Sequence, residues 1–155
     1  MSQYHSYNEV VAMIHNISLS HPDIVRVFFL GKTYEGRDMW AVKVTDKPGT
    51  TEKREPEVLY IGIHHAREWS SVEGVMYFLH FITKYYGMGP TDNDGDGKIK
   101  EDPFNGLDDY SDGLIDEDGP ESRITWHVNN RQLWFIPVST PTVSSSQGTS
   151  ISSRV

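Results

Sequence analysis

The sequence predicts an α/β fold in which a β-sheet is flanked by helices. Apolar residues recur with helical spacing in two segments, and short runs rich in β-branched and aromatic residues lie between and after them. Turn residues such as Gly and Pro separate the runs. The expected helices span 6–20, 70–87 and 122–131, and the expected strands span 24–30, 39–45, 58–63 and 132–138.

Length, composition and net charge limit the classes of protein to which this chain can belong. The chain has 155 residues, the length of one ordinary domain, and 37% of them are hydrophobic, enough for a core. No segment approaches the roughly 18 consecutive apolar residues of a membrane span, and residues 1–5 lack the start of a secretory signal. With no cysteine, His and carboxylate side chains are the expected metal ligands. A net charge of −8 argues against a nucleic-acid partner.

The first helix and the first two strands have clear local signals. Ser6 and Glu9 have the spacing of a capping box, and apolar positions from Tyr7 to Ile17 follow one helical face. His21-Pro22 should end this helix. The runs 24–30 and 39–45, with turn residues between them, fit an antiparallel hairpin.

The run 58–63 breaks directly into polar residues, so we expect a buried strand that delivers side chains to the C-terminal edge of the sheet. His65 and Glu68 follow, three residues apart. One tight turn could aim an imidazole nitrogen and a carboxylate oxygen at one zinc ion. The same spacing fits a surface turn with a salt-bridged Glu68, and spacing alone does not decide between them.

The segment 70–87 predicts a core helix. Ser70 and Glu73 have capping-box spacing, an apolar stripe runs from Val72 to Tyr86, and Gly87 is a typical helix end. A helix beginning here would also favour a carboxylate at Glu68.

The stretch Ile-Gly-Ile-His-His-Ala-Arg-Glu-Trp at 61–69 closely resembles the zinc signature of the metallocarboxypeptidases, the funnelin family that includes carboxypeptidase T. Residues 31–43 and 122–138 are also similar to this family. The resemblance implies the N-terminal portion of the metallocarboxypeptidase fold, a mixed β-sheet flanked by helices. It also implies that His65 and Glu68 ligate Zn²⁺ and that Arg67 contacts substrate.

The resemblance stops after Val138. The family continues with Asn-Pro-Asp-Gly, whereas this chain continues with a Ser- and Thr-rich segment, 139–155, that we expect to be disordered. In the family, the following half of the domain supplies the third zinc ligand, a histidine, and the general base, a glutamate. Neither has a matching position here, so no catalytic residue is assigned and the chain alone should be inactive or nearly so.

The segment 91–121 holds 12 of the 22 acidic residues and is expected to be an acidic insertion. Its pattern from Asp92 to Ile99 matches the first eight positions of a calcium loop, although position 12 is Pro103 instead of Glu. A weak repeat lies sixteen residues further on. The expected calcium ligands are Asp92, Asp94, Asp96, Asp108, Asp112 and Asp116; a solvated acidic loop is the alternative.

These observations predict residues 1–138 as the N-terminal part of a zinc carboxypeptidase catalytic domain acting on peptide or protein C-termini. The alternatives are a noncatalytic, calcium-stabilised binding module and a related zinc deacylase or cell-wall peptidase. Family habit implies an extracellular protein. Because the family sheet is about twice as large, we expect exposed strand edges, apolar patches and self-association.

Overall fold

The computed structural model describes residues 4–64, 68–88 and 120–139 of the chain. Its elements, in chain order, are α1 (Tyr7–Ser20), β1 (Val25–Lys32), β2 (Asp38–Val44), β3 (Glu57–Ile61), α2 (Trp69–Tyr85), α3 (Pro120–Asn130) and β4 (Gln132–Ile136). Each expected helix and strand is present, so the α/β prediction is confirmed.

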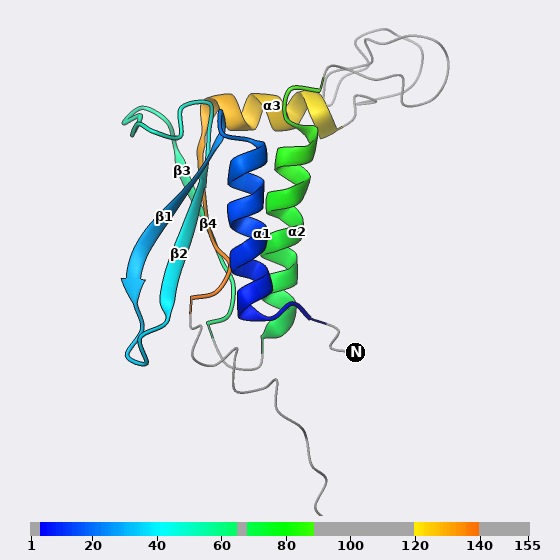
Figure 1. The fold of residues 1–155 in the computed structure, drawn as a ribbon. Helices are drawn as coiled ribbons and strands as arrows, with labels where there is room; N and C mark the ends of the chain where they lie inside the picture. Colours follow the sequence, from blue (N-terminus) through cyan, green and yellow to red (C-terminus); the bar gives the residue numbers. More distant parts are fainter. Residues whose placement is uncertain (1–3, 65–67, 89–119, 140–155) are drawn as a thin grey trace, which may run out of the picture.

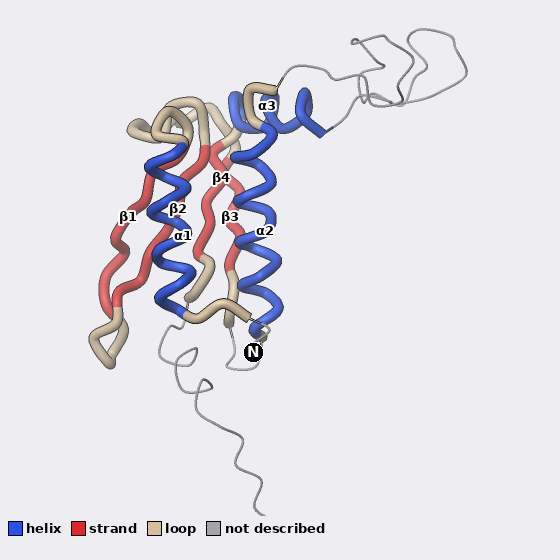
Figure 2. The backbone as a smooth tube through the Cα atoms, turned by 45° about the vertical axis from the view of Figure 1, so that its right-hand side comes forward, coloured by secondary structure: helices blue, strands red, loops and turns tan. Residues whose placement is uncertain are grey.

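The strands form one sheet in the order β1-β2-β4-β3. β1 pairs with β2 and β2 with β4 in antiparallel fashion, whereas β3 and β4 are parallel. The mixed sheet is therefore confirmed. Figures 1 and 2 show α1 and α2 side by side on one face of the sheet, with α3 crossing near the C-terminal end of α2.

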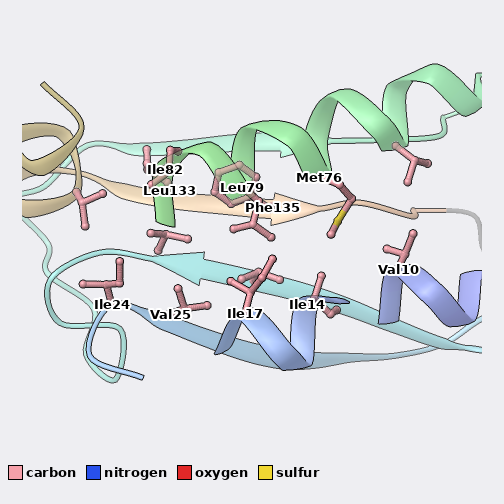
Figure 3. Close-up of a cluster of buried hydrophobic side chains, with 14 of the residues drawn as sticks. Val10, Ile14, Ile17, Ile24, Val25, Met76, Leu79, Ile82, Leu133 and Phe135 are labelled. Carbon is pink, nitrogen blue, oxygen red and sulfur yellow. The ribbon is translucent and has the colours of Figure 1, made fainter. Parts of the chain in front are cut away.

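The core lies between these two helices and the covered face of the sheet (Figure 3). Its centre is Phe135 on β4, which is 0% exposed and stacks on Tyr60 at a centroid distance of 5.0 Å. α1 contributes Val10, Ile14 and Ile17 to this cluster, and α2 contributes Val72, Met76, Leu79 and Ile82. All of these except Val72 are labelled in Figure 3. The apolar stripes that the sequence predicts on α1 and α2 are therefore the helix faces that are buried in the core.

The capping box at the start of α1 is confirmed. The Ser6 backbone N–H donates to Glu9 Oε2 at 2.7 Å, and Glu9 N–H donates to Ser6 Oγ at 3.4 Å. The hydrogen bonds from Ser6 hold the pKa of the Glu9 carboxyl below its ordinary value. The helix ends at the expected place, with His21 as its C-cap.

The expectation that 58–63 is a buried strand is wrong. β3 is an edge strand, and Leu59 is 54% exposed. Its neighbours Val58 and Tyr60 pack against the core, so Leu59 lies on the outer face of the sheet, away from α1 and α2. Leu30 on β1, the other edge strand, is 49% exposed. Helices cover only one face among the described residues, and on the other face the exposed leucines lie on the two edge strands. The prediction of exposed apolar side chains is therefore confirmed for these two edge strands.

No helix in the described part of the chain is long and apolar enough to cross a membrane.

Candidate metal centre

The candidate centre begins where β3 ends. β3 and β4 are parallel, so their C-terminal ends lie at the same edge of the sheet. Gly62 continues the pairing beyond β3, since its N–H donates to Ile136 O at 2.9 Å. His64 is exposed just beyond, and Glu68 is the exposed residue before α2. His65 and Arg67, the other two residues assigned to this site, lie outside the described residues.

Gly62 is required by a close approach of two strand ends. A Cβ atom at this position would lie 2.3 Å from the carbonyl oxygen of Pro137, a separation that real Cβ atoms essentially never show. Ser139 N–H also donates to Gly62 O at 3.2 Å. Ser139, the first residue of the segment that the sequence predicts to be disordered, thus extends the contact between the strand ends. The rest of that segment, 140–155, lies outside the description.

Ile63 has an unusual backbone conformation. Its φ is +47°, in the left-handed region that β-branched residues rarely adopt, and its side chain is 1% exposed in the core. Such a conformation costs on the order of 1–3 kcal/mol and persists only when the surroundings impose it. Core burial on one side and hydrogen bonds on the other impose it here, immediately before the candidate ligands.

The capping box expected at Ser70 and Glu73 is wrong. α2 begins at Trp69, and Glu68 is its N-cap residue, without a side-chain capping bond. Glu73 instead binds the N-terminal segment: its Oε1 accepts from the His5 N–H at 2.8 Å, and its Oε2 lies 2.8 Å from His5 Nδ1. The expectation that a helix N-terminus lies at Glu68 is confirmed, and the helix dipole favours a carboxylate there.

Ser71, in the first turn of α2, makes contacts that the spacing of Ser70 and Glu73 did not predict. Its hydroxyl accepts a hydrogen bond from the Ile63 N–H at 2.8 Å and donates to the Glu68 carbonyl at 2.5 Å. The Ser71 N–H donates to the same carbonyl at 3.0 Å. Ser71 thus joins the end of the β3 segment to the start of α2.

His127 is half-buried on α3. It lines a mainly apolar cavity of about 240 Å³ beside β3, together with Arg131. Burial, followed by the charges of Arg131 and Arg123, lowers the pKa of His127 below its ordinary value. α3 lies near the C-terminal end of α2, whereas Glu68 lies at the opposite end of that helix (Figure 1).

We expect the stability of the chain to fall as the pH is lowered through the ordinary histidine pKa of about 6.5. Because the folded state disfavours protonated His127, the unfolded state binds more protons in this range, and unfolding becomes more favourable. Urea unfolding at about pH 7 and about pH 5 should show a smaller loss of stability for His127→Gln than for wild type. His80→Gln, at an exposed position on α2, is the control. An unchanged loss in His127→Gln would contradict the assignment.

A second acidic group, missed by the sequence analysis, lies in the connection between β2 and β3. One oxygen each from Asp46, Glu52 and Glu55 lies within 4.8 Å of the others. Lys47 Nζ bonds to Asp46 Oδ2 at 3.2 Å and to Glu52 Oε1 at 3.0 Å. Burial and the adjacent Glu52 raise the pKa of the Glu55 carboxyl. Lys47 therefore offsets part of the clustered negative charge. In the sequence, the close spacing of Glu52 and Glu55 is the only sign of this acidic group.

The six expected calcium ligands, Asp92, Asp94, Asp96, Asp108, Asp112 and Asp116, lie outside the described residues.

Comparisons with known proteins agree with this arrangement. The profile of the peptidase M14 family, described as zinc carboxypeptidase, matches residues 10–101. A zinc carboxypeptidase of Saccharothrix mutabilis subsp. capreolus is 39% identical over 88 residues, which are 57% of this chain and 20% of that protein. Rat carboxypeptidase B2 is 36% identical over 91 residues, again 57% of this chain and 20% of the relative. The chain thus spans about one fifth of the length of these relatives.

Solved structures show the same fold at low sequence identity. Bovine thrombin-activatable fibrinolysis inhibitor, solved in complex with tick carboxypeptidase inhibitor, superposes with a TM-score of 0.61 at 20% identity, covering 95% of this chain and 34% of that one. Carboxypeptidase A from Helicoverpa armigera gives a TM-score of 0.57 at 22% identity, covering 89% of this chain and 25% of that one.

Proposed function

This chain belongs to the zinc carboxypeptidase family, and from that premise we propose that it supplies the N-terminal part of a catalytic domain that removes C-terminal residues from peptides. His65 and Glu68 would be two of the zinc ligands, and Arg67 would contact the substrate. The observation that carries the proposal is the position of Glu68, which lies in the connection from β3 to α2, at the first residue before that helix.

The donor set fits zinc. An imidazole and a carboxylate are ordinary zinc ligands. The carboxylate of Glu68 makes no capping bond to α2, and the helix N-terminus favours its charged form. Two protein donors leave the ion incompletely ligated, so tight binding requires a third donor from outside the matched residues.

When bound, zinc in such a site polarises the scissile carbonyl and lowers the pKa of a water molecule. The chain's own contribution would be to hold two donors at a strand end and to place the guanidinium of Arg67 beside the bound peptide. No residue of the 155 matches the family's general base, whose loss typically costs about 10²–10⁴ in rate. We therefore propose that the isolated chain binds zinc and does not hydrolyse peptides at a useful rate.

The test is a calorimetric titration of the purified chain with Zn²⁺, followed by an assay for release of C-terminal residues from a set of peptides. Saturable binding of one zinc ion per chain without hydrolysis is expected. Absence of saturable binding would overturn the assignment. Rapid, zinc-dependent hydrolysis would contradict the proposed inactivity and would point to a general base within these 155 residues.

Calcium binding in the acidic segment is a second part of the proposal and rests on the sequence pattern from Asp92 to Ile99. Millimolar Ca²⁺ should raise the melting temperature of wild type and have no effect on an Asp92→Asn/Asp94→Asn variant. Equal responses in both proteins would leave a solvated acidic loop as the explanation. A calcium-stabilised loop also suits the extracellular location that family habit implies.

We further propose that the outer face of the sheet drives self-association. Leu30 and Leu59 are exposed on it, on the two edge strands, and apolar patches of this kind favour association. Sedimentation of wild type should show oligomers that Leu59→Lys reduces. Leu19→Lys is the control, since Leu19 is 80% exposed on α1. A wild-type chain that stays monomeric at high concentration would contradict this.

A further inference from the structure

We infer that Ser71 is a positioning residue for the metal centre: its hydroxyl joins the two backbone positions that flank His64, His65, Ala66 and Arg67. The Ile63 N–H donates to Ser71 Oγ at 2.8 Å, and Ser71 Oγ donates to the Glu68 carbonyl at 2.5 Å. One side chain thus contacts both ends of the segment that carries the candidate ligands. The inference rests on the proposed zinc site.

The hydroxyl is chemically suited to this bridge. It carries one hydrogen to donate and lone pairs to accept, so a single oxygen can serve an N–H on one side and a carbonyl on the other. Ile63 lies beyond the end of β3 with a left-handed φ of +47°, and Ser71 supplies the acceptor for its N–H. Alanine would remove both bonds, whereas threonine would retain the hydroxyl.

Other interactions already hold the two ends of the segment that the Ser71 hydroxyl joins. Gly62 is held against β4 by its bond to Ile136 O at 2.9 Å, and the Ile63 side chain is buried in the core. On the far side, the Ser71 N–H bonds to Glu68 O at 3.0 Å and keeps that residue at the start of α2. The Ser71 hydroxyl bonds to both of these anchored ends, so it limits how far the backbone at Glu68 can move from the strand end.

Groups outside the ligand set that orient metal ligands typically contribute about 10–100-fold to metal affinity. We therefore expect Ser71→Ala to weaken Zn²⁺ binding by about 10–100-fold. Ser71→Thr should restore most of the affinity. Ser70→Ala is the matched control: Ser70 is the neighbouring serine of α2, is exposed, and makes no side-chain hydrogen bond within the described residues.

The experiment is a Zn²⁺ titration of wild type, Ser71→Ala, Ser71→Thr and Ser70→Ala, at a temperature where circular dichroism shows all four folded. Amide hydrogen exchange of the metal-free proteins provides a readout independent of zinc. The Ile63 amide should be protected in wild type and in Ser71→Thr, and exposed to exchange in Ser71→Ala.

The possible results separate the two proposals. Wild type that fails to bind Zn²⁺ overturns the proposed function, whereas loss of Ile63 protection in Ser71→Ala would still verify the backbone bridge. Wild type that binds Zn²⁺ while Ser71→Ala binds equally well overturns the positioning role of Ser71. An equal loss of affinity in Ser70→Ala and Ser71→Ala would also overturn it, because that loss would come from the helix start in general.

Discussion

Replacing both His65 and Glu68 with alanine is expected to abolish measurable Zn²⁺ binding, and either single replacement should weaken it by more than about 100-fold. The estimate follows from the roughly 10–100-fold cost of disturbing groups that merely orient a ligand, because losing the ligand itself should cost more. Glu68 lies at the N-terminus of α2, where the carboxylate can be lost without removing a capping bond. Calorimetric titration of the three variants measures the effect.

The control for this prediction is His64→Ala. His64 is exposed, directly precedes His65 and has no ligand role in the family pattern that 61–69 resembles. Its replacement should leave the affinity for Zn²⁺ within about threefold of wild type, the context-dependent scatter of a surface substitution. If His64→Ala lost binding and His65→Ala retained it, the ligand assignment within the His-His pair would be wrong.

The second large effect is expected for Phe135→Ala. Phe135 is 0% exposed, stacks on Tyr60 at 5.0 Å and lies 5.9 Å from the ring of Phe78, so it joins the sheet to α2. Truncating a buried Phe costs about 3–5 kcal/mol. A domain of this size is stable by only about 5–15 kcal/mol, so much of its margin would be lost.

Urea unfolding followed by circular dichroism tests this expectation. The midpoint of Phe135→Ala should fall sharply with an unchanged m-value, or the protein should be largely unfolded in buffer. Leu19→Ala is the control, because Leu19 is 80% exposed on α1 and its loss should change stability by less than about 0.5 kcal/mol. A Phe135→Ala protein as stable as this control would show that the packing between β4 and α2 is not as described.

Local sequence patterns predicted the structure correctly where the interacting residues lie close together in the chain. The capping box of Ser6 and Glu9 joins residues three apart, and the structure contains it. The apolar face of α1 was readable because helical geometry alone brings Val10, Ile14 and Ile17 together. The family resemblance of 61–69 was also present in the residue order alone, and the family match over 10–101 bears it out.

Patterns failed where partners are distant along the chain. Ser70 and Glu73 have capping-box spacing, but Glu73 binds His5, 68 residues away, and α2 starts at Trp69. A rule based on residue spacing takes no account of a distant residue, here His5, that binds the same side chain. The role of Ser71 was invisible for the same reason, because it depends on how β3 and α2 approach each other.

The sequence by itself determined the α/β class, the helices and strands and the hairpin of β1 and β2, because each follows from residue type and short spacing. It also proposed His65 and Glu68 as zinc ligands, through the family resemblance of 61–69 and not through spacing alone. Only the tertiary structure decided that β4 lies between β2 and β3, that β3 is a half-exposed edge, and that Gly62 must lack a side chain. Strand order and close approach arise from packing between segments far apart in the chain. The alternation of side chains within one strand does not indicate which other strands pair with it.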